Sequence, residues 1–314
     1  MGLGHVMRSA ALAEAALRRG SSIRIFFEGD PSARRAWRTA SPQSEDIPLR
    51  AWSDYPAGPP SPIAFLDYPT PKNEWIESIR RHGSHSVVLD DPRSVDRADM
   101  TINPALHHAR TSPNAEAQSR SLDGPVYSIL AEPHRQTKSP SWHSRTNLLL
   151  SIGGADPHGA TPKLGRWVSE VLASPSMAAL SPLPFTHKHA VLGASFQDPE
   201  HCVRHALAEA GWQIHSALTP KDMAHLMASA RLAIMGFGTS LTELAWHGTP
   251  HLSVTHHRFD IAHAESLELR GVGRHLGQAE GLDPAITKQR LQRGLADAKW
   301  QESSARTALS LIHI

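Results

Sequence analysis

The sequence predicts an α/β fold with two Rossmann-like domains, and three observations support this prediction. Short apolar runs typical of buried strands alternate with stretches of helical periodicity. Glycine-containing turns follow several of these runs. The length of 314 residues suits two domains better than one. We place the boundary at residues 136–145, between a domain over 1–140 and a domain over 141–314. Ligand sites are expected at the carboxyl ends of the strands, in a cleft between the facing domains.

The first domain opens with a predicted helix over residues 7–19, because apolar residues recur there at helical spacing and Gly20 can end the helix. Residues 104–145 are rich in Pro, Ser, His and Arg and contain one strand-like run at 126–130, so irregular structure leading into a linker is expected. The remaining predicted elements of this domain are strands at 23–27, 47–52, 63–67 and 86–90 and a helix at 72–81.

The second domain repeats the alternation. The run at 146–152 predicts its first strand, and a Gly-Gly-Ala-Asp-Pro turn follows that strand. Further strands are predicted at 188–192, 231–235 and 251–254, and helices at 161–172, 199–210, 220–229, 240–247 and 259–270.

The composition excludes several classes of function. The 32 basic and 30 acidic residues are interspersed and sum to +2, which disfavours nucleic-acid or anionic-membrane binding. The single cysteine, Cys202, rules out an intramolecular disulfide, and none of the 21 histidines lies in an H-E-x-x-H frame. No stretch resembles a signal peptide or is long enough to span a membrane. We therefore expect a cytoplasmic protein without a bound metal or cofactor, with a monomer as the working expectation.

The run from Gly2 to Arg8 is the first candidate site. Gly4 lets the backbone approach a ligand, and His5 follows it at the positive end of the predicted helix. That position favours the neutral imidazole, which can accept a proton as a general base. The run lacks the third glycine of a dinucleotide fingerprint. The alternative is that His5 only fills the turn.

A second candidate site combines a strand, a glycine turn and the start of a helix. Gly238, Thr239 and Ser240 offer backbone amides and hydroxyls to a diphosphate. Glu243, one turn further, can accept two hydrogen bonds from a ribose diol. The alternative is that Ser240 and Glu243 form a capping box that stabilises the helix without any ligand.

Other polar residues follow predicted strands. Gly153, Gly154 and Asp156 end the first strand of the second domain, and glycine there permits close approach of a ligand. Asp67 with Tyr68, and Asp90 with Asp91, end strands of the first domain and are expected at the cleft. Turn formation or helix capping is the alternative role for these carboxylates. The chain has no Asp-x-Asp pair for a metal on a diphosphate, which favours a metal-free mechanism.

Together these segments resemble a known family. The segments are the G-L-G-H-V-M-R-S-A-A-L-A run at 2–13, L-D-Y at 66–68, L-D-D at 89–91, I-G-G-A-D-P at 152–157 and G-T-S-L-T-E-L at 238–244. In this order they resemble the hydrolases of pseudaminic acid biosynthesis, which remove UDP from UDP-2,4-diacetamido-2,4,6-trideoxy-β-L-altropyranose. Those hydrolases are related to glycosyltransferases of the GT-B fold, so the resemblance implies that fold here.

The resemblance also implies roles for individual residues. His5 matches the histidine thought to activate water for attack on the anomeric carbon, with inversion and without a metal. UDP is implied against the second domain, with Gly238, Thr239 and Ser240 near the diphosphate and Glu243 on the ribose. Arg8, Asp67, Tyr68 and Asp91 are implied on the sugar side. The substrate is then a small UDP-sugar. A UDP-sugar glycosyltransferase and a non-catalytic nucleotide-sugar binding protein are the alternatives.

The chain departs from the family pattern at several positions. His257 and Arg258 stand where the family has an Asn-Gln pair, Ala131 stands where an arginine is expected, and Gly159 replaces an asparagine. The family's first strand precedes the G-x-G-H turn, whereas Met1 stands almost on that turn. We therefore expect the first sheet either to lack its central strand or to gain it from an upstream start.

Overall fold

The computed structural model describes residues 3–56, 58–68, 71–104, 119–180 and 184–313. The chain divides into two compact units, Met1–Glu132 and Pro133–Ile314. This division lies a few residues before the boundary expected at 136–145. Each unit combines helices with sheets in which all strand pairs are parallel, so the predicted α/β class is confirmed.

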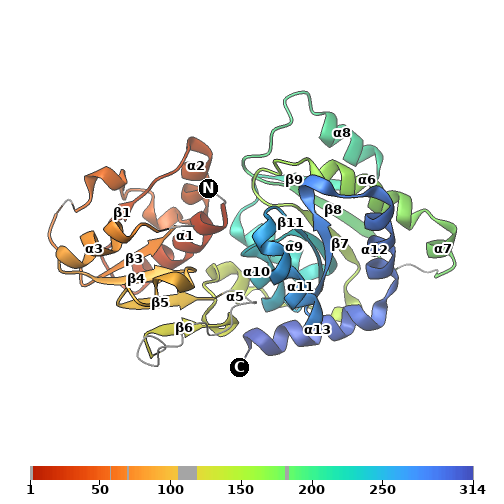
Figure 1. Cartoon of the computed structure of the whole chain (residues 1–314). Coiled ribbons are helices and arrows are strands. Elements are labelled where there is room, and N and C mark those ends of the chain that lie inside the picture. The colour runs from red at the N-terminus through yellow and green to blue at the C-terminus, as the bar shows by residue number, and fades with distance from the viewer. Residues whose placement is uncertain (1–2, 57, 69–70, 105–118, 181–183, 314) are drawn as a thin grey trace. The chain divides into compact units, whose positions relative to one another are not determined.

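The first part of unit 1 consists of α1 (Leu3–Arg18), β1 (Ile25–Phe26), α2 (Pro31–Ala40) and β2 (Leu49–Arg50) (Figure 1). Asp30 caps α2 by accepting a hydrogen bond from the Ala33 amide, and Pro31 suits the first turn because it has no amide hydrogen to satisfy. β1 and β2 form a two-stranded parallel sheet. The apolar faces of α1 and α2 pack with Ile25 and Phe27 into one small core.

The second part of unit 1 is a four-stranded parallel sheet in the order β3-β4-β5-β6, with α3 (Asn73–Arg81) between its first two strands. Its strands are β3 (Ile63–Asp67), β4 (His85–Leu89), β5 (Met100–Asn103) and β6 (Ser121–Asp123). The strand predicted at 126–130 is wrong. Pro125–Tyr127 forms a 3₁₀ turn instead, entered through Gly124 at a φ of 112°.

The two sheets of unit 1 are not joined by backbone pairing. Among the described residues β1 pairs only with β2, and β3 pairs only with β4. β3 consequently behaves as an edge strand, with Ile63 51% and Phe65 47% exposed. A separate small core around Ile76, Ile79 and Val88 lies under the four-stranded sheet. The described strands of unit 1 thus form two separate parallel sheets.

Unit 2 contains one six-stranded parallel sheet in the order β12-β11-β10-β7-β8-β9. The strands are β7 (Asn147–Ser151), β8 (His187–Leu192), β9 (Gln213–Ser216), β10 (Ala230–Gly236), β11 (His251–Thr255) and β12 (Gly273–Gln278). The helices are α5 (Glu132–Gln136), α6 (Ala160–Leu172), α7 (Pro175–Ala178), α8 (Cys202–Glu209), α9 (Pro220–Ser229), α10 (Ser240–Trp246), α11 (Ile261–Leu269), α12 (Pro284–Ala296) and α13 (Ala298–Ile312). The chain leaves β7 toward β8 on one side, and returns later to place β10 on its other side.

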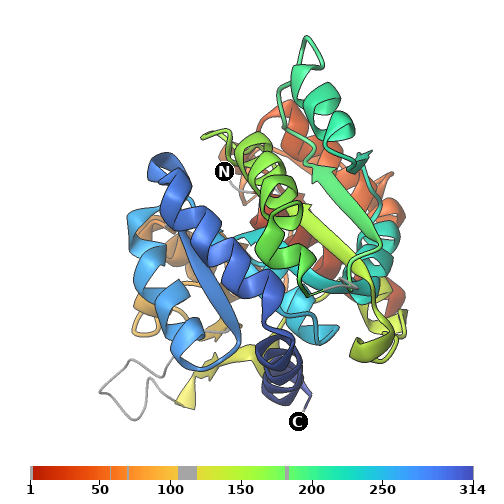
Figure 2. The ribbon, with the colours of Figure 1, turned by 90° about the vertical axis from the view of Figure 1, so that its right-hand side faces the viewer.

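Helices cover both faces of this sheet. α6, α8 and α12 pack together on one face, and Figure 2 shows α6 in green beside α12 in blue. α9, α10 and α11 pack on the other face. The sheet is apolar on both sides, with β10 buried throughout, as expected for a doubly covered parallel sheet. No helix in the described part of the chain is both long enough and apolar enough to cross a membrane.

Candidate active site

The first turns of α1 bring three polar side chains to the carboxyl end of β3. His5, Arg8 and Ser9 are spaced so that they share one face of the helix. The carboxylate of Asp67, the last residue of β3, accepts hydrogen bonds from all three side chains. Its Oδ1 lies 2.6 Å from both His5 Nδ1 and Arg8 Nη2, while its Oδ2 accepts from Arg8 Nε at 3.0 Å and Ser9 Oγ at 2.8 Å. This polar cluster links the α1 part of unit 1 to its four-stranded sheet. The helix begins at Leu3 rather than near residue 7, so Gly4 and His5 lie within its first turn, while Gly2 falls outside the described residues.

Asp67 is held in its charged form. Its side chain is only 5% exposed, and burial alone would raise its pKa. Hydrogen bonds from His5 and Arg8 and the positive charge of Arg8 outweigh burial and lower the pKa of Asp67 below its ordinary value. The same partners act on Arg8: burial lowers the pKa of the guanidinium, but Asp67 and Asp90 raise it overall. A permanent buried ion pair therefore lies directly against His5.

This ion pair fixes the tautomer of His5. Arg8 can only donate, so its Nη2 and the His5 Nδ1–H both donate to Oδ1 of Asp67. The 3.1 Å between Arg8 Nη2 and His5 Nδ1 reflects this shared acceptor. In the neutral ring the lone pair then lies on Nε2, and the side chain is 22% exposed. His5 thus presents a proton acceptor whose orientation is set by a carboxylate.

The neighbouring carboxylates Asp90 and Asp91 have different partners. Asp90, at a φ of 59°, turns back to accept from Arg8 Nη1 at 2.8 Å. Asp91, expected on the sugar side, is buried and accepts from Ser94 Oγ and Arg93 Nε at 2.7 Å each. Its role in the structure is to hold the turn Pro92–Ser94. Tyr68 packs edge-on against Trp75, with ring centroids 4.8 Å apart.

Two glycine turns follow adjacent strands of unit 2. Gly153 and Gly154 come after β7, and Gly238 comes after β10. Gly153 has a φ of 89°, and a Cβ at Gly193 would lie 2.3 Å from the Gly153 carbonyl oxygen, so this turn needs small residues. The chain reverses direction across the sheet between β7 and β10. In open α/β sheets ligands bind beyond the carboxyl ends of the strands at such a point.

The start of α10 is not closed by a capping box. Thr239 is the cap residue and makes no side-chain cap hydrogen bond, and a Cβ on Gly238 would meet open space. Ser240 lies at the first helical position. The carboxylate of Glu243 instead points to His134, with Oε1 3.5 Å from Nε2. The capping alternative for Ser240 and Glu243 is therefore wrong.

Asp156, in contrast, has the structural role. Both its carboxylate oxygens are occupied at the start of α6, accepting from the Ala160 amide at 2.9 Å and the Thr161 amide at 2.7 Å. The side chain is buried and the φ is 46°. Asp156 thus caps the helix, the alternative role given for it, and its contact with a ligand stays a prediction.

The departures from the family pattern have structural explanations in two places. Gly159 adopts a φ of 60° as the residue preceding α6, a conformation that glycine takes without strain. His257 is exposed and its ring stacks on Phe259, with centroids 5.0 Å apart. Arg258 is exposed beside it, and Ala131 is half-buried just before α5.

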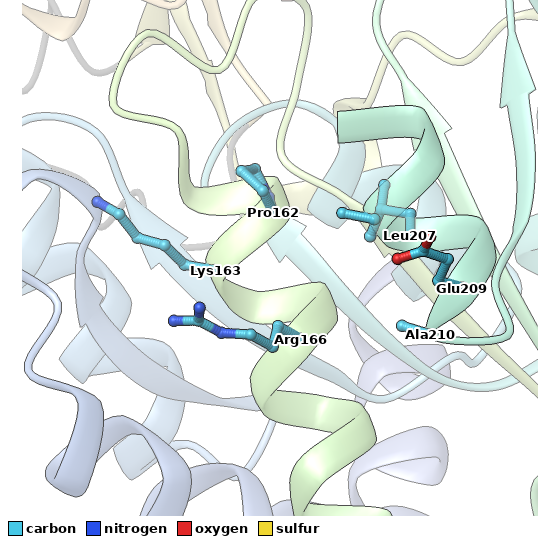
Figure 3. A pocket seen from close by; sticks show the side chains of 7 residues that line it. Pro162, Lys163, Arg166, Leu207, Glu209 and Ala210 are labelled. Atoms are coloured by element: carbon cyan, nitrogen blue, oxygen red, sulfur yellow. The ribbon is translucent and has the colours of Figure 1, made fainter. Parts of the chain in front are cut away.

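A cavity of about 450 Å³ lies elsewhere in unit 2, between α6 and α8 (Figure 3). Pro162, Lys163 and Arg166 line it from α6, and Leu207, Glu209 and Ala210 from the other side. None of the predicted site residues lines it, and it lies between two helices on the sheet face that α6, α8 and α12 cover. No group of three or more His, Cys, Asp and Glu among the described residues is arranged to hold a metal ion.

Comparison with known proteins supports the fold. No protein-family model matches the chain. The spore coat polysaccharide biosynthesis protein SpsG of Bacillus subtilis (strain 168) is 24% identical over 290 residues, covering 89% of this chain and 81% of that protein. The crystal structure of Acinetobacter baumannii MurG matches with a TM-score of 0.65 at 15% identity, covering 98% of this chain and 92% of the other. That of LpCGTa in complex with UDP matches with 0.62 at 15% identity, covering 99% and 92%. The chain has the GT-B fold.

In this GT-B chain, three of the residues named from the sequence lie together. His5, Arg8 and Asp67 are in direct contact, while their roles in a reaction remain predictions. Ser9, one residue beyond Arg8, was missed although the helical spacing places it on the same face. In unit 2 the buried histidines His134 and His247 were missed, because no local pattern connects residues so distant along the chain.

Proposed function

We propose that the chain is a hydrolase that cleaves a UDP-sugar at the anomeric C–O bond, releasing UDP and a 2,4-diacetamido-trideoxy hexose for nonulosonic acid biosynthesis. The main support for this proposal is the geometry of His5. Its Nδ1 is hydrogen-bonded to Asp67, which leaves Nε2 to accept a proton. The match to SpsG, a protein of spore coat polysaccharide biosynthesis, supports a role in making a surface sugar. The match to LpCGTa in complex with UDP supports a uridine nucleotide as ligand.

The proposed reaction is a direct displacement. His5 Nε2 takes a proton from water as the water oxygen forms a bond to the anomeric carbon. The bond from that carbon to the phosphate oxygen breaks, and its electron pair leaves with UDP. The attack comes from the side opposite the leaving group, so the configuration inverts. The negative charge of Asp67 stabilises the imidazolium formed in this step, and Arg8 keeps Asp67 ionised.

In the proposal unit 2 binds the leaving group. The open turn at Gly238 and the hydroxyls of Thr239 and Ser240 receive the diphosphate, at the switch point of the sheet. Glu243 accepts hydrogen bonds from the ribose. UDP is a good leaving group once its charge is accommodated, so the displacement needs no strong acid on the sugar side.

The test is incubation of the purified protein with UDP-2,4-diacetamido-2,4,6-trideoxyhexoses, with and without a sugar or lipid acceptor. We expect UDP and free reducing sugar in equal amounts without an acceptor, and the opposite anomer as the first product detected by NMR. Release of UDP only when an acceptor is present would instead identify a glycosyltransferase. Binding of the nucleotide sugar without any turnover would identify a non-catalytic binding protein. His5→Asn is the matched inactive control.

A further inference from the structure

A chain of polar side chains leads through the interior of unit 2 to Glu243. Ser139 Oγ lies 2.8 Å from His247 Nδ1, and His247 Nε2 lies 3.1 Å from His134 Nδ1. His134 Nε2 in turn lies 3.5 Å from Glu243 Oε1. The side chain of His134 is 2% exposed, while that of Glu243 is 20% exposed. His247 is fully buried. Two buried rings thus connect to one partly exposed carboxylate.

The acceptors at the two ends of this series favour one arrangement of its protons. A carboxylate can only accept, so the 3.5 Å contact with Glu243 favours a proton on His134 Nε2. With the proton there, His134 Nδ1 accepts from His247 Nε2, and His247 Nδ1 accepts from the Ser139 hydroxyl. Burial lowers the pKa of His247 to about 3, and His134 and Arg145 act in the same direction, so His247 stays neutral. Each group in the series has a donor facing an acceptor.

Backbone contacts hold the two rings in place. Trp246 Nε1 donates to the carbonyl oxygen of His134 at 2.9 Å, which ties α5 to α10. Arg145 Nη2 donates to the carbonyl oxygen of His247 at 2.7 Å. The position of the His134 ring relative to Glu243 is therefore set by the fold of unit 2 and does not depend on a ligand.

We propose that His134 is a positioning residue for nucleotide recognition, which holds the Glu243 carboxylate ready for the ribose hydroxyls while His247 and Ser139 fix its tautomer. The inference deepens the proposed function and rests on it, because Glu243 is the ribose ligand there. Oε1 lies 3.5 Å from His134 Nε2, and the remaining lone pairs of the carboxylate would accept from the 2′- and 3′-hydroxyls. A carboxylate held in advance loses less conformational freedom on binding than a free one.

The test compares the affinity for UDP with that for 2′-deoxy-UDP by calorimetry. The wild-type protein is expected to prefer UDP by about tenfold or more, because a hydroxyl donating to a carboxylate is a strong hydrogen bond. His134→Phe keeps a ring but removes both nitrogens, and is expected to reduce this preference to below about threefold while the 2′-deoxy-UDP affinity stays within about twofold. His134→Gln retains an amide donor toward Glu243 and is expected to recover part of the preference. His189→Phe, which alters a buried histidine on β8, is the matched control and should leave the preference unchanged.

The outcomes separate the two proposals. If the wild-type protein binds neither nucleotide, the proposed function is refuted, and this inference falls with it. Suppose that the wild-type protein prefers UDP, and that His134→Phe keeps this preference or lowers the affinity for both nucleotides equally. The positioning role is then refuted and the proposed function stands. Should His134→Phe fail to fold, Ser139→Ala replaces it. That variant removes the hydroxyl that fixes which nitrogen of His247 carries the proton. It is expected to lower the preference for UDP over 2′-deoxy-UDP at least about twofold, and an unchanged preference would refute the positioning role of His134.

Discussion

Replacing His5 with asparagine separates its chemical role from its structural one. The asparagine Nδ2 can occupy the place of His5 Nδ1 and donate to Asp67 Oδ1, so the contact that measures 2.6 Å in the structure has a substitute. The variant has no counterpart of Nε2 and cannot take a proton from water. General-base losses are on the order of 10²–10⁴ in rate, equivalent to about 2.7–5.4 kcal/mol in the activation barrier. We therefore expect UDP release to fall at least about a hundredfold.

The assay measures UDP release together with UDP affinity and thermal unfolding. UDP affinity should stay within about twofold of wild type, because the predicted nucleotide ligands belong to unit 2. His85→Asn is the matched control, since this histidine is exposed at the opposite, amino end of β4 and should leave the rate unchanged. A His5→Asn protein that is folded and retains more than about a tenth of the wild-type rate would remove His5 from the chemistry.

Three further predictions concern stability. Asp67→Asn should lower the free energy of unfolding by about 1–3 kcal/mol, because Arg8 loses the more buried of its two counter-charges and keeps only Asp90; urea denaturation checks this, and an unchanged free energy of unfolding would contradict it. Burial lowers the pKa of His247 to about 3 and of His251 to about 4, so below pH 6.5 the unfolded chain binds protons that the folded chain does not. The melting temperature should therefore fall steadily from pH 7 to pH 4.5, and a flat or rising profile would be the opposite result. Amides of β3 should exchange faster than those of β7, which is paired on both sides, and equal protection by hydrogen exchange would disprove the open edge.

The sequence predicted the central strands of unit 2 well, for a physical reason. β7, β10 and β11 are largely apolar and buried on both faces, and that pattern is visible locally. The more polar β9 and β12 went unpredicted. β5 and β6 went unpredicted because their pairing is polar. Thr101 Oγ1 lies 2.8 Å from Ser121 Oγ, and Asn103 Nδ2 donates to Asp123 Oδ1 at 2.7 Å. A strand held by partly buried hydrogen bonds of this kind has no apolar periodicity to detect.

Contacts within the candidate site could be predicted where a motif places the residues at fixed spacing on one helix. They could not be predicted where the backbone conformation of a single residue decides which way the chain turns. His5 and Arg8 share a helix face at fixed spacing, and Asp67 ends a strand, so their meeting followed from the expected topology. The choice between Asp90 and Asp91 depended on one left-handed residue, Asp90, whose φ of 59° could not be read from its sequence. His134 belongs to a segment expected to be irregular, and its partner His247 is distant in sequence.

The ion pairs around His5 also determine how the net charge of the site changes when a proton is transferred to His5. While the imidazole is neutral, Arg8, Asp67, Asp90 and His5 together carry one net negative charge. When the imidazole takes a proton, the same four side chains become electrically neutral. In the proposed reaction, the proton taken from water thus reduces the net charge of these four side chains from minus one to zero. In the proposed reaction, this negative charge would also lie near an anomeric carbon that gains positive character as its bond to phosphate lengthens. In a substrate dominated by the negative diphosphate, that polarity would favour a sugar ring over a phosphate next to His5.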